Sequence, residues 1–310
     1  MAATQSSLLA FILLLALLLS QSHGHGEADR PEAFQFLRHL EGSRKGDRVK
    51  GLNEAKRYLH RFGYLDHHND DDDFDHHLES AIKTYQLYYN LNETGSLDFE
   101  TVKQMMLPRC GFPDIINGET WMRSGKEKNR RLGGRKTAVG FSSHYAFFNN
   151  SLKWPPSKMH LKYALDTNVP FDDVVMNPLC YVAFDKWAAI SDFTFERTYD
   201  LSSADILISF FKGDHGDGHL FDGPGGVLAH SFAPTGGRLH YDLEENWVAG
   251  IRAGSFDLES VAVHEIGHLL GLWHTPVTEA VMFAYLKDGT QKVNLHQDDI
   301  DGLRALYGIH

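Results

Sequence analysis

The sequence predicts an α/β (α+β) domain with a twisted mixed sheet and a long histidine-bearing helix, preceded by a small three-helix domain. Three observations lead to this prediction: an apolar, histidine-rich helical pattern near residue 264, short strand-like segments between residues 159 and 242, and three amphipathic stripes between residues 48 and 107. At 310 residues, the chain is long enough for two small domains and processing segments.

Apolar residues at helical spacing predict three helices in residues 48–107. Gly63 ends the first helix, and residues 92–96 form a turn before the third. The three stripes consist of Leu52, Ala55, Leu59 and Phe62, then Leu78, Ile82, Tyr85 and Tyr89, then Phe99, Val102 and Met106.

The run DHHNDDDDFDHH, residues 66–77, mixes carboxylates with imidazoles. Such a run could bind a metal ion. We expect a solvated loop instead, because nothing in the sequence holds the ligands in a defined geometry.

From Thr137 onward the pattern becomes α/β. Alternating apolar residues predict a half-buried strand over residues 159–165, and an apolar run predicts a buried strand over residues 204–211. Residues 226–232 and 238–242 are further short strands, and residues 178–190 form a helix. A final helix is expected from Asn294, with Gln297 three residues on, to Gly308.

His264, Glu265, His268, Gly271 and His274 form the pattern H-E-x-x-H-x-x-G-x-x-H. Asp257 is the expected N-cap of the helix, and histidines four apart project from one helical face, where they can bind one zinc ion. The glycine can adopt positive φ and turn the chain back, which makes the last histidine a third ligand. The fourth position stays open for water, as in a catalytic zinc site.

This arrangement predicts zinc-dependent hydrolysis of peptide bonds without a covalent intermediate. Zinc lowers the pKa of bound water towards ~7, and Glu265 removes the proton and later returns it to the leaving amine. One alternative is a core helix with incidental histidines. Another is a non-catalytic zinc-binding or wall-binding protein with the same fold, although such a protein would not need Glu265.

These motifs resemble the matrixins, the matrix metalloproteinase branch of the metzincins, and look most like the short plant members. The resemblance implies a metzincin zinc-protease domain with a methionine turn at Met282. The chain departs from the usual family pattern at Thr275, where serine is common, and at Phe283-Ala284, where Tyr-Pro is common.

Residues 108–114, PRCGFPD, are similar to the cysteine switch of the matrixins. The resemblance implies that Cys110 occupies the fourth zinc position in a latent form, and Arg109 could pair with Asp114 to shape the loop. The alternative is a disulfide between Cys110 and Cys180, but the apolar surroundings of Cys180 favour a buried thiol.

The same resemblance divides the chain into a signal peptide (1–22), a propeptide (23–136) and a catalytic domain (137–310). Within the propeptide, residues 48–107 resemble a peptidoglycan-binding-like module, which could bind glycan or serve only to present the switch. The basic segment 126–136 is an exposed linker where an activating protease is expected to cleave, near residues 131–137.

A second group of residues matches the metal sites of the family. The resemblance implies a structural zinc ion and a calcium ion, so that the expected cofactors are two Zn²⁺ and Ca²⁺. The zinc ligands would be His215, Asp217, His230 and His240, and the calcium ligands Asp222, Asp242 and Glu245 with the carbonyls of Gly223, Gly225 and Val227. Asp205 would belong to a further calcium site, which Arg238 should weaken because many matrixins have aspartate at that position. The alternative is a surface loop rich in glycine and aspartate.

The N-terminus and the charge indicate the compartment. Residues 8–19 are almost wholly apolar, as in a signal peptide, and no later segment is long and apolar enough to span a membrane. Asn92 and Asn149 lie in glycosylation sequons, and the net charge of −11 argues against nucleic acid as a partner. We therefore expect a secreted monomer of the apoplast or extracellular matrix, whose partners are protein or peptide substrates and an activating protease.

Overall fold

The computed structural model describes residues 33–116, here called the N-terminal domain, and residues 153–309, called the C-terminal domain. Both belong to one unit, Glu32–His310. The predicted signal peptide, the linker 126–136 with its cleavage region, and Asn149 lie outside the described residues. None of the helices in the described ranges is long and apolar enough to cross a membrane.

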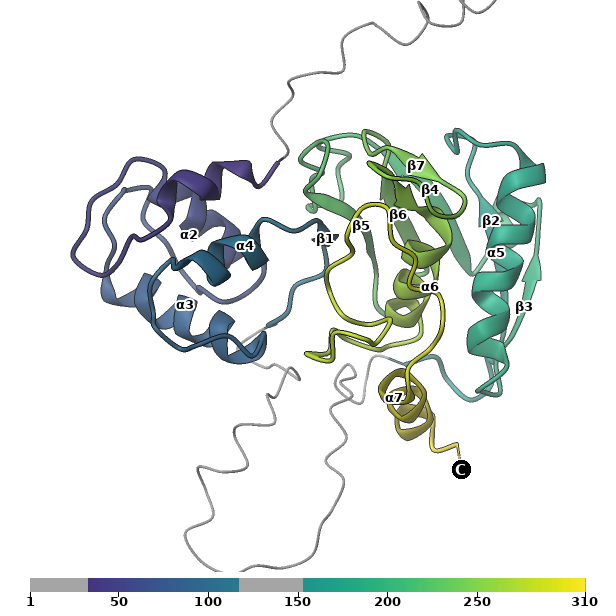
Figure 1. The fold of residues 1–310 in the computed structure, drawn as a ribbon. Coiled ribbons are helices and arrows are strands. Elements are labelled where there is room, and N and C mark those ends of the chain that lie inside the picture. Colours follow the sequence, from purple (N-terminus) through teal and green to yellow (C-terminus); the bar gives the residue numbers. More distant parts are fainter. Residues whose placement is uncertain (1–32, 117–152, 310) are drawn as a thin grey trace, which may run out of the picture. The chain divides into compact units, whose positions relative to one another are not determined.

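The N-terminal domain contains the three predicted α-helices, α2 (Leu52–Arg61), α3 (His76–Tyr88) and α4 (Phe99–Met105), as shown in Figure 1. A 3₁₀ helix that the sequence did not predict, η1 (Gln35–Leu40), precedes them. The third apolar stripe needs correction, because Phe99 is 57% exposed and Met105, rather than Met106, is buried beside Val102.

Residues 66–75 form a mostly exposed loop, as expected, and residues 76–77 begin α3. The sequence did not predict that this loop is tied to α2. Asp72 accepts hydrogen bonds from the backbone N–H groups of Gly51 (3.0 Å) and Asn53 (3.2 Å), and so caps the start of α2. Its neighbour Asp71 pairs with the buried Lys56 in α2. The acidic run is therefore an ion-paired strap along α2, and among the described residues it belongs to neither group that could hold a metal ion.

The C-terminal domain is built on a mixed sheet, as predicted. Strand β5 is antiparallel to β6, whereas the other neighbouring pairs are parallel. The outer strand β1 comes from the N-terminal domain, and β3 was not predicted. The strand order is β1 (Arg109–Cys110), β5 (Val227–Ser231), β6 (Arg238–Asp242), β4 (Ile206–Phe211), β2 (His160–Leu165) and β3 (Thr194–Arg197).

Helices α5 (Asp173–Ala188) and α6 (Leu258–Leu269) pack against each other and against the sheet. The first of them begins five residues before the predicted Pro178. That proline is tolerated inside the helix because the carbonyl it leaves unpaired belongs to Val174, which is 85% exposed and open to water. A short pair that was not predicted, β7 (Trp247–Val248) and β8 (Phe256–Asp257), leads into α6.

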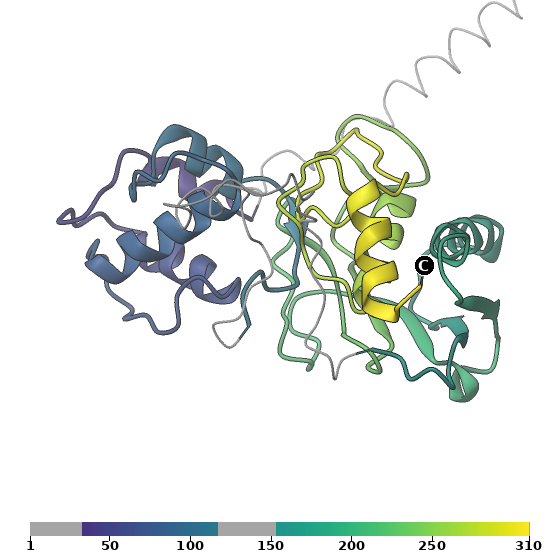
Figure 2. The ribbon, with the colours of Figure 1, turned by 90° about the horizontal axis from the view of Figure 1, so that it is seen from below.

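The last helix, α7 (Gln297–Tyr307), begins later than predicted. Its N-cap is His296, in a capping box with Asp299, so Asn294 does not start the helix. Gly308 ends it at φ +69°, as predicted. The Tyr307 hydroxyl donates to the Leu270 carbonyl (2.9 Å) and joins α7 to the end of α6. Helix α7 is the yellow helix in Figure 2.

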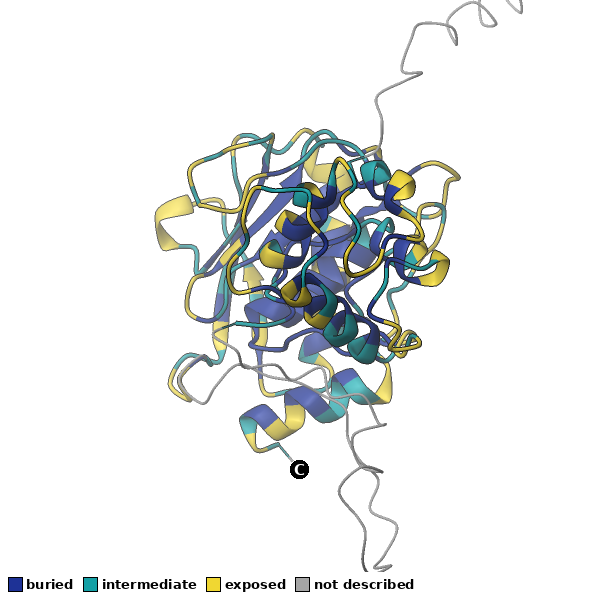
Figure 3. Ribbon diagram, turned by 90° about the vertical axis from the view of Figure 1, so that its left-hand side faces the viewer, coloured by how far each residue is buried: buried dark blue, intermediate teal, exposed yellow. Residues whose placement is uncertain are grey.

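Figure 3 shows buried residues along the strands and on the inner faces of the helices. In α6, only Glu259 is not buried. Two core tryptophans hold this helix by their indole N–H groups: Trp187 donates to Val263 O (2.9 Å) and Trp154 to Leu269 O (2.8 Å). The histidines of α6 are therefore fixed in a rigid, apolar setting.

Candidate metal centre and active site

Local structure places three imidazoles together. Asp257 caps α6 by accepting from the Ser260 N–H (3.1 Å), which confirms the predicted N-cap. After the helix, Gly271 has φ +102°, a conformation that favours glycine, and the chain turns back to His274. His264, His268 and His274 consequently face one point, as predicted.

Hydrogen bonds to the far ring nitrogens select one tautomer. The Nδ1–H groups of His264 and His268 donate to the carbonyls of Val281 (2.7 Å) and Leu272 (2.8 Å). The Nδ1–H of His274 donates to the Asp114 carboxylate (2.7 Å). Because carbonyls and carboxylates only accept, each imidazole turns an Nε2 lone pair inward.

The inward nitrogens fit a metal ion. His268 Nε2 lies 3.1 Å from His264 Nε2 and 3.2 Å from His274 Nε2. Burial lowers the pKa of all three imidazoles, so they are neutral at pH 7. Three lone pairs this close repel one another unless a cation lies between them, and three imidazoles around an open position suit zinc.

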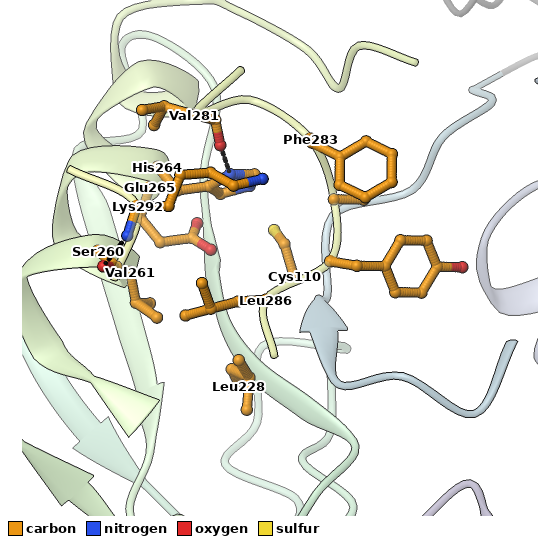
Figure 4. Close-up of a pocket in the computed structure, with 12 residues that line it drawn as sticks. Cys110, Leu228, Ser260, Val261, His264, Glu265, Val281, Phe283, Leu286 and Lys292 are labelled. Atoms are coloured by element: carbon orange, nitrogen blue, oxygen red, sulfur yellow. Dashed lines mark hydrogen bonds between the residues drawn. The ribbon is translucent and has the colours of Figure 1, made fainter. Parts of the chain in front are cut away.

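Cys110 is the fourth member of this group. The backbone of β1 is hydrogen-bonded on both sides, from Cys110 N–H to Ala284 O (2.8 Å) and from Gly111 N–H to Ala229 O (2.8 Å). This places Cys110 Sγ 3.5 Å from His268 Nε2, and Figure 4 shows the thiol directed towards His264 and Glu265. Both cysteines are free and buried, so the alternative of a Cys110–Cys180 disulfide is wrong.

The predicted pair of Arg109 and Asp114 is confirmed, at 2.7 Å and with both side chains fully buried. Asp114 also accepts from the hydroxyls of Tyr64 (2.7 Å) and Tyr89 (2.9 Å) in the N-terminal domain. Burial raises the pKa of the Asp114 carboxyl, but the Arg109 guanidinium and the bond from His274 outweigh it and keep this pKa well below the usual range. The sequence did not predict that this aspartate would reach a metal-centre histidine.

Glu265 is fully buried beside the metal centre. Burial raises the pKa of its carboxyl group to about 7, and the neighbouring Cys110 thiol and Ser231 hydroxyl lower it in part. A carboxyl group with this pKa can both accept and return a proton at neutral pH.

Met282 lies beneath α6, as expected for a methionine turn. A Cβ atom at Gly267 would come within 2.3 Å of Met282 Sδ, so the close contact requires glycine in the helix. Asp299 accepts from the N–H groups of Val281 (2.9 Å) and Met282 (3.0 Å) and holds the turn from below. This anchoring role was not predicted.

A second group brings together His215, Asp217, His230 and His240. One carboxylate oxygen of Asp217 lies 2.8 Å from His215 Nε2, 2.8 Å from His230 Nε2 and 2.9 Å from His240 Nδ1. Burial lowers the pKa of His230 to about 3 and of His240 to about 4. Neutral imidazoles around a carboxylate fit a closed zinc site, whereas His219 is exposed outside the group.

The three predicted calcium carboxylates, Asp222, Asp242 and Glu245, act on one another electrostatically, but in the described residues they form neither of the two groups whose ligand atoms all lie within 4.8 Å of one another. Burial and mutual repulsion raise the pKa of Asp242 to about 7 and of Glu245 to about 8, and burial also raises that of Asp222. The buried Oδ2 of Asp242 has no hydrogen-bond partner among the described residues. A divalent cation could use the free oxygen of Asp242 and neutralise its charge and that of Glu245. Both oxygens of Asp222 already accept, from Val227 N–H (2.8 Å) and from Arg61 (2.9 Å). Gly225 donates its N–H to Glu245 (2.8 Å) and Val227 to Asp222 (2.8 Å), while a Cβ at Gly223 would meet nothing within 4 Å.

Asp205 and Arg238, the residues predicted around a further calcium site, both contact other protein side chains. Asp205 pairs with Lys158 (2.7 Å) and accepts the Lys162 N–H (2.9 Å), and the Arg238 guanidinium lies 3.8 Å from the centre of the Phe232 ring. Asp205 is therefore paired with the Lys158 ammonium rather than left free for a metal ion. Asn92 is exposed, as a glycosylated residue must be.

A cavity opens beside the metal centre. Its lining includes Cys110, His264 and Glu265, together with an apolar wall and Lys292, which lies beside Ser260 in Figure 4. Burial lowers the pKa of Lys292 to about 8. No sequence motif predicted this lysine, because its position depends on the return of the loop after Met282.

Known proteins match most of the chain. The sequence profile of the matrixin family covers residues 153–308, and one of peptidoglycan-binding domains covers residues 48–105. Metalloendoproteinase 1 of Glycine max is 42% identical, over 97% of this chain and 96% of the relative. Metalloendoproteinase 2-MMP of Arabidopsis thaliana is 41% identical, over 87% of this chain and 74% of the relative. Interstitial collagenase A of Mus musculus is 34% identical, over 74% of this chain and 44% of the relative.

Proposed function

The chain belongs to the matrixin family and is a zinc metalloendopeptidase, and on this premise we propose that it is secreted as a latent zymogen that hydrolyses proteins of the extracellular matrix or cell wall. The observation that supports the zymogen is the Cys110 thiol, 3.5 Å from His268 Nε2 at the point where the three imidazoles converge.

In this proposal His264, His268 and His274 hold the catalytic zinc. When bound, zinc supplies a Lewis acid that polarises the substrate carbonyl and acidifies water. Glu265 takes a proton from the attacking water and transfers it to the leaving amine, and its pKa of about 7 suits both steps. The buried, apolar surroundings of α6 strengthen these charge interactions.

Residues 1–22 act as the signal peptide and 23–136 as the propeptide, in which the N-terminal domain presents Cys110. Pairing of β1 with β5, and the buried Arg109–Asp114 pair, support this role because they hold the thiol in place. Cleavage near residues 131–137 then releases the catalytic domain, 137–310. His215, Asp217, His230 and His240 hold a structural zinc ion, and the cluster of Asp222, Asp242 and Glu245 holds calcium.

The full-length chain tests both parts of the proposal. Untreated protein should cleave a quenched fluorogenic peptide slowly, and a thiol-reactive organomercurial should activate it by capping Cys110. A zinc chelator should abolish that activity, and added zinc should restore it. Peptide cleavage that the chelator leaves unchanged would overturn the zinc mechanism.

Cys110→Ser separates latency from catalysis. This variant should be active without the mercurial, because a neutral hydroxyl is a much weaker zinc ligand than a thiolate. Cys180→Ser, which changes the other buried thiol, should remain latent. Full latency of the Cys110 variant would argue against the thiol as the blocking group.

A further inference from the structure

The residues that line the cavity beside the metal centre are mainly apolar, and the cationic residue among them is Lys292. Leu228, Val261, Val281 and Leu286 contribute apolar surface to the wall of the cavity. Apart from the metal-centre residues, the polar lining residues are Ser260, Tyr285 and Lys292, and the Tyr285 hydroxyl is bonded to those of Tyr58 and Tyr85. A charged group in such surroundings is costly to bury unless it is paired.

The backbone of Lys292 is fixed at the start of α6. Its N–H donates to Ser260 Oγ (2.8 Å), the dashed contact beside Ser260 in Figure 4. The Ser260 hydroxyl in turn donates to Asp257 (2.7 Å), the N-cap of the helix. The lysine is therefore held in position by the same helix that carries Glu265.

The ammonium group of Lys292 is only partly satisfied. It donates to Thr278 O (2.7 Å) and lies 5.0 Å from the centre of the Phe283 ring. An ammonium has three N–H donors, and no carboxylate of the described residues lies within 4.0 Å of it. Asp299 and Glu279 act on it only from further away, and the Asp299 oxygens are bonded to backbone N–H groups.

The position of the cavity relative to Glu265 identifies the part of the substrate that enters it. Glu265 must lie close to the leaving amine in order to protonate it, and this amine belongs to the residue directly after the cleaved bond. The side chain of that residue is therefore the one that reaches the cavity lined by Glu265.

We propose that Lys292 determines specificity at this position, so that the enzyme prefers a carboxylate-ended side chain after the cleaved bond over its neutral amide counterpart. This inference rests on the proposed function. The apolar wall accepts the methylene groups of glutamate or the side chain of leucine, and the ammonium pairs with the carboxylate. A lysine side chain in the same place meets a like charge and is disfavoured.

Four peptides that differ only in the residue after the cleaved bond (Leu, Glu, Gln or Lys) test this proposal on the full-length, mercurial-activated protein at neutral pH. For the wild type, kcat/KM for the Glu peptide should exceed that for the Gln peptide by about tenfold. Lys292→Met should reduce this ratio to near one and leave the Leu peptide within about threefold. Lys292→Arg should retain the preference, because it keeps the positive charge.

Lys287→Met is the matched control, since it removes the same charge from an exposed position in the same loop. It should leave the Glu-to-Gln ratio unchanged. An unchanged ratio in Lys292→Met, or an equal loss in the control, would overturn the specificity proposal. Failure of the activated wild type to cleave any of the peptides would instead overturn the proposed function, and this inference with it.

Discussion

Burial tunes single residues of the metal centre for different tasks. The same apolar surroundings lower the pKa of His264, which keeps its lone pair available for a metal, and raise that of Glu265 to about 7. Burial disfavours the ionised form of each side chain. That form is a cation for histidine and an anion for glutamate, so the two pKa values shift in opposite directions. A ligand and a proton carrier can therefore be adjacent in sequence and still have different roles.

Replacing Glu265 with glutamine should remove proton transfer and little else. The amide is nearly isosteric, so fold and zinc content should persist while kcat/KM falls by about a thousandfold. Peptide cleavage and metal analysis of the activated protein measure the two effects. Glu259→Gln in the same helix, where the carboxylate pairs with Lys186 (3.5 Å), should stay within about twofold of the wild type. Comparable turnover by the Glu265 variant would contradict the proton-transfer role.

Lys292 should lower stability in a pH-dependent way. Its pKa is about 8 in the folded protein, against 10.5 for an ordinary lysine. Below pH 8 both states carry the proton and the folded state bears the full cost of burying the charge. As the pH rises from 8 to 10.5 the folded state releases its proton first, and the cost fades.

Lys292→Met should consequently raise the free energy of unfolding at pH 7 by on the order of 1 kcal/mol. The gain should shrink as the pH approaches 10.5. Chemical denaturation of the wild type and the variant across this pH range measures the difference in their free energies of unfolding. Tyrosine titrations are common to both proteins and cancel in this difference. A difference that stays constant with pH would show that the burial of charge is not its cause.

At the level of secondary structure, α2 has an unusual N-terminal cap. Its N-cap residue is Gly51, in the left-handed region at φ +97°, and has no side chain to cap the helix. Asp72 supplies the missing acceptor from a distant part of the chain. The helix therefore depends on the acidic strap, although the two segments are separated by the rest of α2 and its following loop.

Asp72→Ala should destabilise the first turn of α2 by about 1 kcal/mol, the usual size of a lost N-cap. Hydrogen exchange of the α2 amides in the full-length protein should accelerate by about fivefold. Asp70→Ala is the control from the same run, because its pair with Arg57 is exposed on both sides and contributes little. Equal exchange rates in the two variants would show that Asp72 does not act as a cap.

At the scale of the whole molecule, a buried tyrosine cluster joins the two domains. The Tyr285 hydroxyl is bonded to those of Tyr85 (2.7 Å) and Tyr58 (3.1 Å), and it accepts from Arg109 (3.3 Å). Burial raises the pKa of these tyrosines, so the hydroxyl network persists at physiological pH. An outer contact, from Arg61 to Asp222 (2.9 Å), adds to it.

Tyr285→Phe should weaken the docking of the N-terminal domain, because it leaves buried hydroxyls in the partner domain without a bond. The untreated full-length variant should cleave peptides several-fold faster than the untreated wild type, while activity after the mercurial stays similar. Tyr181→Phe, at a 64% exposed position, should behave like the wild type. An untreated Tyr285 variant as inactive as the wild type would show that the switch alone maintains latency.

Local patterns in the sequence were enough to predict the metal-centre helix, its cap and the glycine turn that returns His274. They also predicted the three N-terminal helices, four of the strands and the Arg109–Asp114 pair, because periodicity, caps and short loops act over a few residues. The start of α5 was misjudged because Pro178 can be tolerated where water reaches the freed carbonyl.

Only the tertiary structure revealed the contacts that join distant segments: Asp114 to His274, Tyr285 to Tyr85, Asp72 to the start of α2, and Lys292 to Ser260. Each contact joins residues that are far apart in the sequence, so no local pattern predicts it. The distance between such side chains is set by how the helices and loops pack. The sequence alone thus determined the chemistry of the metal centre. Packing decided what surrounds it, from the tyrosine cluster that holds the N-terminal domain to the cation in the wall of the cavity.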